Sequence, residues 1–200
     1  LASVTVEDTL KHPNWNMGAK ITVDSATLMN KGLELIEAVW LFGCQASDVE
    51  IVVHRESVVH SAVEFCDHSV IAQLGTPNMK LPIQYALTYP KRVPCSVKPL
   101  SLTDYGTLSF AKPDMDTFAC LKACYEALEK GGLYPTLVNG ANEQAVQLFL
   151  KRKISFLTIG KLVRNVLQLK LEHNNITPDL IDMADHLARQ YVLSHYKELN

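Results

Sequence analysis

Apolar residues at helical spacing predict a long helix near the start of the chain. Four of them share one face, at i, i+4, i+7 and i+11: Met29, Leu33, Ile36 and Trp40. Ser25 precedes this run and is a favourable N-cap, because its hydroxyl can accept a hydrogen bond from an unpaired backbone N–H. Gly43 is placed to end the helix. The pattern therefore predicts a single helix from about Ser25 to Gly43.

Valine-rich segments predict β-structure after this helix. The candidate strands are 49–54, 57–65 and 70–74, and the Asp-His-Ser sequence at 67–69 makes a plausible hairpin turn. Thr76-Pro77-Asn78 then opens a short helix that runs to about Thr88. This part of the chain, residues 1–88, is predicted to be a mixed α+β domain.

The remaining residues predict a linker and a bundle. Residues 89–114 carry four prolines, which is typical of a connecting segment. Residues 115–200 contain four helical patterns: 116–130, 136–152, 157–172 and 177–198. Short connections between four helices favour a bundle. The predicted fold class is therefore α+β: a small mixed or antiparallel sheet with helices, followed by a C-terminal α-helical bundle.

Composition narrows the class of protein. Of the 200 residues, 48% are apolar and 20% are charged, as in ordinary globular chains, and the net charge is −2. This balance argues against a general nucleic-acid binder, and no apolar run is long enough for a membrane span. Five scattered cysteines are typical of reduced thiols, and we expect Cys120 and Cys124 to face the core.

Polar residues in the predicted helix suit a phosphate. Ser25, Asn30 and Lys31 offer a hydroxyl, an amide and a positive charge near a helix start, where the dipole favours anions. Glu34 lies one turn further on and is a hard oxygen ligand suited to Mg²⁺ or Mn²⁺. The same residues also fit a solvated helix face with a Lys31–Glu34 pair. From the residues alone, the solvated face is the favoured interpretation.

A loop before the helix and a histidine in a strand leave two further alternatives open. Pro13, Trp15, Met17 and Gly18 form a loop rich in large apolar groups. Such a loop can close as a flap over a ligand or anchor in the core, and from the residues alone the anchor is the favoured interpretation. His60 lies in a valine-rich strand, where a lone histidine is usually structural. The spacing of His12, His54 and His60 does not indicate a zinc site.

The order of residues from His12 to Glu34 resembles a family signature. His-Pro-Asn-Trp-x-Met-Gly at 12–18, followed by Val-Asp-Ser-Ala-Thr-x-Met-Asn-Lys-Gly-Leu-Glu at 23–34, is similar to the flap and helix of 1-deoxy-D-xylulose 5-phosphate reductoisomerases. Further matches fall at 57–61, 73–79, 97–100 and 139–143. The resemblance therefore spans almost the whole chain.

The resemblance implies a function and roles for particular residues. Members of the family isomerise a phosphorylated ketose and reduce it with NADPH, using Mg²⁺ or Mn²⁺, to 2-C-methyl-D-erythritol 4-phosphate. The implied substrate-binding residues are Ser25, Asn30, Lys31, His12, Trp15 and Pro77. The implied cofactor-binding residues are Met17, Gly18 and Met79. The implied catalytic residues are Glu34, His12 and His60, with Glu34 as the metal ligand.

The sequence also departs from the family pattern. It contains no glycine-rich dinucleotide-binding fingerprint and no upstream Asp-Ser-Glu-His-type segment with the other metal ligands. We therefore expect the intact parent to be the enzyme and these 200 residues alone to be inactive. The family further implies a homodimer, and a cytoplasmic location in bacteria or a plastid location in plants and apicomplexans. The alternatives are a non-enzymatic dimerisation or interaction module and a different NADPH oxidoreductase.

Overall fold

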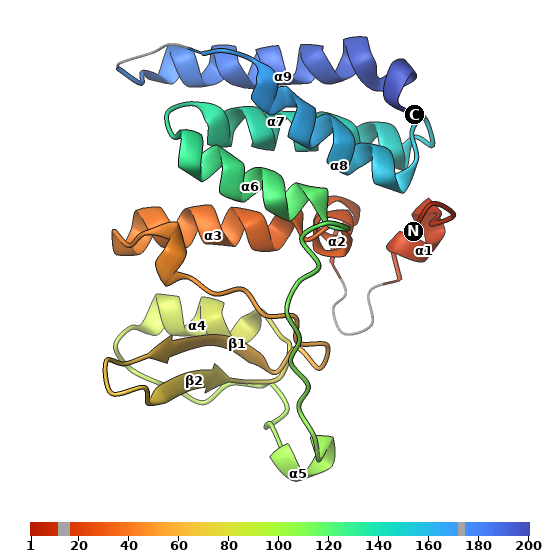
Figure 1. Cartoon of the computed structure of the whole chain (residues 1–200). Coiled ribbons are helices and arrows are strands. Elements are labelled where there is room, and N and C mark those ends of the chain that lie inside the picture. The colour runs from red at the N-terminus through yellow and green to blue at the C-terminus, as the bar shows by residue number, and fades with distance from the viewer. Residues whose placement is uncertain (12–16, 172–174) are drawn as a thin grey trace. The chain divides into compact units, whose positions relative to one another are not determined.

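A computed structural model describes residues 1–11, 17–171 and 175–200. Within these residues the chain divides into two compact units (Figure 1). The first comprises 1–11, Met17–Ile51 and Pro113–Asn200, and the second comprises Val52–Lys112. The predicted domain limits at 88/89 and 114/115 stay a prediction.

The first unit is helical. Its α-helices are α1 (Val6–Thr9), α2 (Ala19–Ala26), α3 (Met29–Phe42), α6 (Ala119–Lys130), α7 (Tyr134–Leu150), α8 (Phe156–Asn165) and α9 (Pro178–Leu199). Two short 3-10 helices, Ala46–Asp48 and Val166–Gln168, complete it. Helix α7 packs against α9 and α8, α6 packs against α8, and α3 packs against α6, so that the helices form successive layers (Figure 1). The predicted C-terminal bundle is confirmed.

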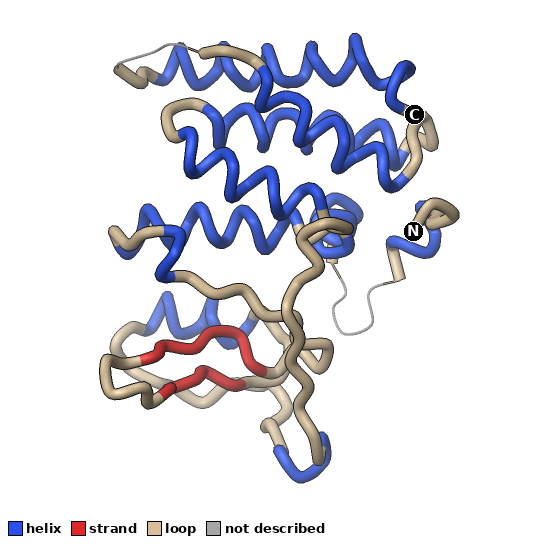
Figure 2. Tube along the Cα trace, viewed as in Figure 1, coloured by secondary structure: helices blue, strands red, loops and turns tan. Residues whose placement is uncertain are grey.

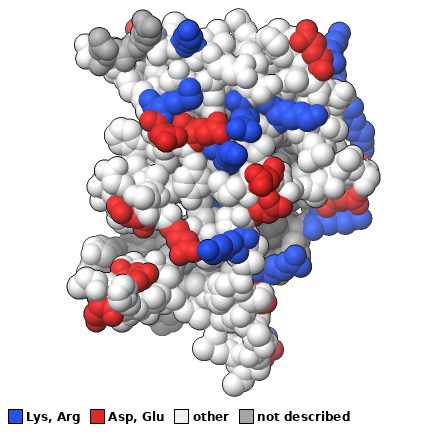
Figure 3. Space-filling model, viewed as in Figure 1, with Lys and Arg blue, Asp and Glu red and all other residues white. Residues whose placement is uncertain are grey.

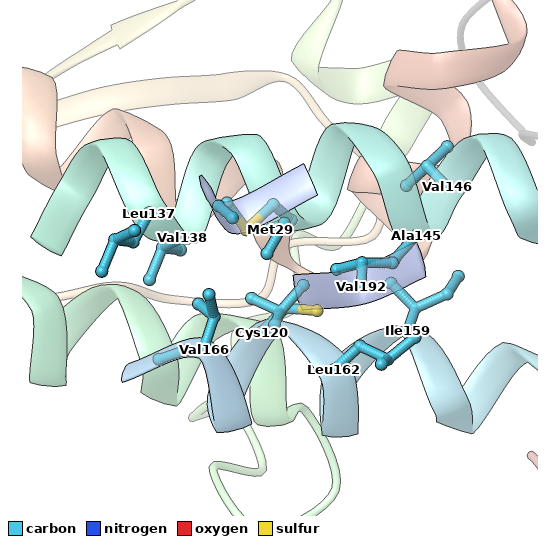
Figure 4. Packing of buried hydrophobic residues seen from close by; sticks show 14 of the residues in the cluster. Met29, Cys120, Leu137, Val138, Ala145, Val146, Ile159, Leu162, Val166 and Val192 are labelled. Atoms are coloured by element: carbon cyan, nitrogen blue, oxygen red, sulfur yellow. The ribbon is translucent and has the colours of Figure 1, made fainter. Parts of the chain in front are cut away.

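The core of this unit draws apolar side chains from every long helix. Fully buried residues from α3, α7, α8 and α9 meet Cys120 of α6 (Figure 4): Met29, Leu137, Val138, Ala145, Val146, Ile159, Leu162 and Val192. The N-terminal segment contributes Met29 together with Val6 and Val23, and the Met29 sulfur lies 3.7 Å from the Cys124 sulfur. Burial of apolar area drives this packing. Consequently, the segment 19–42 is held to the bundle by a common core.

The cysteines of α6 are structural, as expected. Cys120 and Cys124 are buried. Burial raises the pKa of the Cys120 thiol to about 12 and also raises that of Cys124, because a thiolate would lose its hydration there. A thiol held protonated is a poor nucleophile. Both side chains therefore act as packing groups.

The predicted start of the long helix is wrong. Ser25 does not cap it but lies in the last turn of α2, where its hydroxyl donates to the Ile21 carbonyl at 2.9 Å. The helical conformation is interrupted between α2 and α3 at Leu28, which has a positive φ of 58°. Thr27 stabilises the break, since its hydroxyl donates to the Asp24 carbonyl and accepts from the Met29 N–H. Such local bonds compete with helix continuation.

The predicted end of the helix is confirmed, but its predicted apolar face is only partly buried. Gly43 ends α3 with a φ of 63°. Met29 is fully buried, whereas Trp40 is 75% exposed in this structure. Leu41 and Phe42 beside it are also exposed. The last turn of α3 therefore presents aromatic and aliphatic surface rather than core contacts.

The second unit contains the sheet (Figure 2). Strand β1 (Val59–Glu64) pairs antiparallel with β2 (Val70–Leu74) through a turn in which His68 has a φ of 66°. Helices α4 (Lys80–Thr88) and α5 (Leu102–Tyr105) follow. The predicted strand at 49–54 is wrong, because that segment forms an isolated bridge from Val53 to Ala111 and no ladder. The α+β fold class is confirmed.

Membrane crossing was tested on the helices. Among residues 1–11, 17–171 and 175–200, no helix combines the length and the apolar character that a crossing requires.

Gly32 allows the close approach of α3 to α6, which leads to a prediction. A Cβ at this position would lie 2.5 Å from the Cys124 sulfur and 2.7 Å from its Cβ. We expect Gly32→Ala to lower the free energy of unfolding by about 1–3 kcal/mol, the usual cost of overpacking. Denaturant unfolding measures this. Gly18→Ala is the control, since a Cβ there meets nothing within 4 Å; equal stability of both variants would contradict the close contact.

Candidate functional site

The candidate phosphate site lies at the junction of α2 and α3, defined here as residues 25–31. Ser25 stands in the last turn of α2, and Asn30 and Lys31 stand in the first turn of α3. The structure thus places all three within one helix–turn–helix segment of the first unit. The first backbone N–H groups of α3 carry the positive end of its dipole, which suits an anion.

Asn30, Lys31 and Glu34 form one hydrogen-bonded cluster on α3. The Asn30 Nδ2 donates to Glu34 Oε1 at 2.8 Å, and Lys31 Nζ lies 2.5 Å from Glu34 Oε2. The side chains of Lys31 and Glu34 are 41% and 47% exposed, so ligands in solution can reach both. The Lys31–Glu34 pair of the solvated-face interpretation is therefore present. It does not exclude a ligand, because exposed pairs of this kind exchange partners at little cost.

A buried polar network beside the junction was missed by the sequence reasoning. The Asp24 carboxylate accepts from Asn142 Nδ2 at 2.9 Å and pairs with Lys20 Nζ at 2.7 Å. Lys20 also pairs with Glu143 of α7 at 2.7 Å. Partial burial lowers the pKa of Lys20, but its hydrogen bonds to Asp24 and Glu143 outweigh burial and leave the pKa above its usual value. The available sequence signal was the i, i+4 spacing of Lys20 and Asp24.

The flap residues are described in part. His12 and Trp15, assigned to substrate binding, lie outside the described residues. Met17 is half-buried immediately before α2. Gly18 is the N-cap of α2, and its carbonyl accepts from the Thr22 hydroxyl at 2.8 Å. Met17 and Gly18 thus lead directly into the segment that carries Ser25.

His60, Pro77 and Met79 belong to the second unit. His60 lies in β1, with its Nε2 3.1 Å from the Gly75 carbonyl oxygen. Pro77 is half-buried in the segment between β2 and α4, and Met79 is an exposed residue at the start of α4. Thr76 steadies this segment by donating to the Lys98 carbonyl at 2.8 Å. Their roles in binding stay predictions.

The described residues do not make a complete metal site. Across 1–11, 17–171 and 175–200, no three His, Cys, Asp or Glu side chains converge in a group that could hold an ion. Glu34 has the hard oxygen donors that Mg²⁺ or Mn²⁺ prefers, but a carboxylate alone holds neither ion tightly. Glu34 therefore fits the role of one metal ligand, and further ligands would have to come from other residues.

Charges on one face of the molecule are mixed in sign. On the face that Figure 3 shows, basic and acidic side chains of the described residues lie interspersed, without a broad surface of one sign. The net charge of −2 does not itself attract anions, so a preference for an anion would have to arise from local groups such as those at the junction. The expectation that the chain does not bind nucleic acid stays a prediction.

Comparisons with known proteins assign the chain to a family. One family model, the DXP reductoisomerase C-terminal domain, matches residues 74–191, and a second, the 1-deoxy-D-xylulose 5-phosphate reductoisomerase C-terminal domain, matches residues 1–42. The helix junction and the helical bundle together define a class, the C-terminal domains of reductoisomerases. The chain belongs to the DXP reductoisomerase C-terminal domain family.

Relatives and solved structures agree with this membership. The chain is 53% identical over 98% of its length to 1-deoxy-D-xylulose 5-phosphate reductoisomerase of Clostridium perfringens, and 53% identical over 97% to that of Geobacillus kaustophilus. It spans about half the length of these curated relatives, 51% of each.

Two solved structures are also similar. One is DOX-P reductoisomerase in complex with NADPH, fosmidomycin and magnesium, with a TM-score of 0.93, 42% identity, and coverage of 99% of this chain and 51% of the other. The other is the Zymomonas mobilis enzyme in complex with NADPH, with a TM-score of 0.88, 40% identity, and coverage of 96% and 50%.

The exposed cluster on α3 leads to a prediction about stability. We expect Lys31→Met and Glu34→Gln each to change the free energy of unfolding by less than about 0.5 kcal/mol, because exposed pairs at i, i+3 contribute little. Urea unfolding measures this. Lys20→Met is the positive control, since it removes the ion pair of the buried Asp24 carboxylate. A large loss in either α3 variant would show that the cluster serves the fold rather than a ligand.

Proposed function

We propose that this chain is the part of a 1-deoxy-D-xylulose 5-phosphate reductoisomerase that grips the substrate phosphate and contributes one metal ligand. The whole protein would isomerise 1-deoxy-D-xylulose 5-phosphate and reduce the product with NADPH to 2-C-methyl-D-erythritol 4-phosphate. The observation that carries the proposal is that Ser25, Asn30 and Lys31 lie at one helix junction, with Glu34 about one turn further along α3 and bonded to Asn30 and Lys31. Family membership supports it.

Phosphate binding requires an exchange of partners at the junction. Lys31 Nζ contacts the Glu34 carboxylate, and the phosphate group would replace that carboxylate as its partner. The dianion favours this exchange because it bears more charge than a carboxylate and meets the positive end of α3. Ser25 can add a hydroxyl donor if it turns from the Ile21 carbonyl to the phosphate, and Asn30 can add an amide donor in place of its bond to Glu34. Glu34, released from Lys31, is then available to a cation.

The metal and the nicotinamide cofactor need residues beyond those described. A bound Mg²⁺ or Mn²⁺ would supply Lewis-acid polarisation of the substrate oxygens, with Glu34 as one ligand. We assign Met17, Gly18 and Met79 to the cofactor, and His12, Trp15, Pro77 and His60 to the substrate or the catalytic centre. One carboxylate and no dinucleotide fingerprint are insufficient for turnover. We therefore expect no NADPH-dependent turnover by these 200 residues alone.

An NMR titration tests the phosphate site. The labelled chain is titrated with 1-deoxy-D-xylulose 5-phosphate and, in parallel, with unphosphorylated 1-deoxy-D-xylulose. We expect amide shifts at residues 25–31 with the phosphate ester alone, because the groups there recognise an anion. Lys31→Met, expected to leave the fold intact, should abolish most of the response. Equal shifts with both sugars, or no shift at 25–31, would overturn the proposal.

We also propose that the protein is a homodimer and resides in the cytoplasm of a bacterium. The named relatives are bacterial. The hairpin of the second unit supports self-association, because its exposed apolar residues would otherwise face water: Val63, Phe65, Val70 and Ile71. Val63 and Ile71 are direct cross-strand partners, so they form one continuous apolar spot. An unpaired strand edge adds to this tendency.

Light scattering tests self-association. The chain is expected to have twice the monomer mass, and Ile71→Lys should shift it towards the monomer because a charge in an apolar interface is costly. Ala62→Lys is the control, since position 62 faces the opposite side of the hairpin. A folded monomer at high concentration would contradict the dimer.

A further inference from the structure

The carboxylate of Asp24 is buried directly beside the candidate phosphate site. Asp24 is 2% exposed and immediately precedes Ser25 in the last turn of α2. A buried carboxylate destabilises a fold unless ion pairs and hydrogen bonds compensate it. The partners of Asp24 therefore determine whether the last turn of α2 can occupy its position.

These partners tie α2 to α7. Each oxygen of the Asp24 carboxylate has its own partner. Oδ1 accepts from Asn142 Nδ2 at 2.9 Å, and Oδ2 pairs with Lys20 Nζ at 2.7 Å. Lys20 Nζ also forms an ion pair with Glu143, so α2 bonds to two successive side chains of α7. The amide of Asn142 has one orientation that fits, because its oxygen facing Asp24 would set two acceptors against each other. The link is thus directional.

Helix α7 is itself a firm anchor. Gly140 permits close contact with α9, since a Cβ there would lie 2.8 Å from Asp185 Oδ1 and 3.2 Å from Ala188 Cβ. Asp185 forms a two-pronged ion pair with Arg189, at 2.7 and 3.0 Å. Asn142 projects from this packed region and is fully buried. A group fixed to α7 is therefore fixed to the bundle.

The junction needs such an anchor because its backbone is strained. Leu28 has a left-handed φ of 58°, a backbone conformation that is strained for a residue with a Cβ. The Thr27 hydroxyl donates a hydrogen bond to the Asp24 carbonyl, so the strained turn is bonded directly to Asp24. Met29 is locked in the core just after it. The turn is thus held on both sides, by the bonds of Asp24 before it and by the buried side chain of Met29 after it.

We propose that Asp24 is a positioning residue, whose bonds to Asn142 and Lys20 set the junction of α2 and α3 in the geometry that binds phosphate. This rests on the proposed function, since the phosphate is the ligand being positioned. Asp24 does not touch the ligand. It acts through Ser25, the next residue, and through the first turn of α3, where Asn30 and Lys31 stand. Preorganised donors bind an anion without the cost of ordering them.

Three variants of the buried pair test this. Asp24→Asn keeps the shape and removes the charge that faces Lys20. Asn142→Ala is the gentler change, because it keeps the carboxylate and its ion pair with Lys20 and removes the Asn142–Asp24 hydrogen bond, while Lys20 still pairs with Glu143 of α7. The double variant Asp24→Asn with Asn142→Asp exchanges the two groups and restores an amide–carboxylate bond. Val192→Ala is the matched control, since it creates a cavity in the bundle core but breaks neither bond of the Asp24 carboxylate.

Inorganic phosphate is titrated into each folded variant, with its dissociation constant read from amide shifts. We expect Asp24→Asn and Asn142→Ala to bind about tenfold more weakly, as lost positioning of a few ångströms or less suffices for that change. The exchanged pair should recover part of the affinity. Val192→Ala should bind as the original chain does. Full affinity in Asp24→Asn and Asn142→Ala, or an equal loss in Val192→Ala, would overturn the positioning role.

Amide hydrogen exchange without ligand separates this inference from the proposed function. Exchange at residues 25–31 should be faster in Asp24→Asn and Asn142→Ala, slower again in the exchanged pair, and unchanged in Val192→Ala. If the original chain fails to respond to phosphate, the proposed function falls, and the exchange rates alone decide whether Asp24 holds the junction. Unchanged rates in both single variants would overturn that claim.

Discussion

The bond between the Asp24 carboxylate and the Asn142 amide is the interaction on which the site depends, because it joins the two parts of the chain that build the first unit. Asp24 lies near the N-terminus in α2, and Asn142 lies in α7, 118 positions later. Without a partner, burial of that carboxylate would cost more than the segment gains by packing. With Lys20 and Asn142 in place, the last turn of α2 can sit against the bundle.

The rest of the site follows from that attachment. The turn after Asp24 is too tight for a continuous helix, so α2 and α3 are separate helices and a second helix start is created at Met29. Met29 enters the bundle core and Gly32 lets α3 approach Cys124, which leaves the opposite residues accessible. Lys31 and Glu34 are among them and pair with each other. A phosphate ligand would replace the Lys31–Glu34 ion pair with an ion pair between Lys31 and the phosphate.

Sequence reasoning predicted the elements better than their connections. The four C-terminal helices, the hairpin turn at His68 and the end of α3 at Gly43 have local signals, and the structure has all of them. The break at Leu28 was not predicted, because a left-handed φ is unusual for leucine; the local signal was Thr27, whose hydroxyl bonds to the backbone on both sides of the break. Trp40 fits the periodicity of an apolar face, yet the end of α3 extends beyond the buried surface. The segment 49–54 forms a single bridge, from Val53 to Ala111, and not a strand of the described sheet.

The spacing of the candidate site residues was predictable from the sequence, but the contacts that hold them in place were not. Asn30, Lys31 and Glu34 follow helical spacing, whereas Asn142 is brought to Asp24 by the fold. A crystal structure of the chain with bound 1-deoxy-D-xylulose 5-phosphate tests the central claim most directly. We expect the phosphate within hydrogen-bond distance of Ser25, Asn30 and Lys31, with Lys31 Nζ moved away from Glu34. A phosphate bound elsewhere, with the Lys31–Glu34 pair intact, would contradict the account.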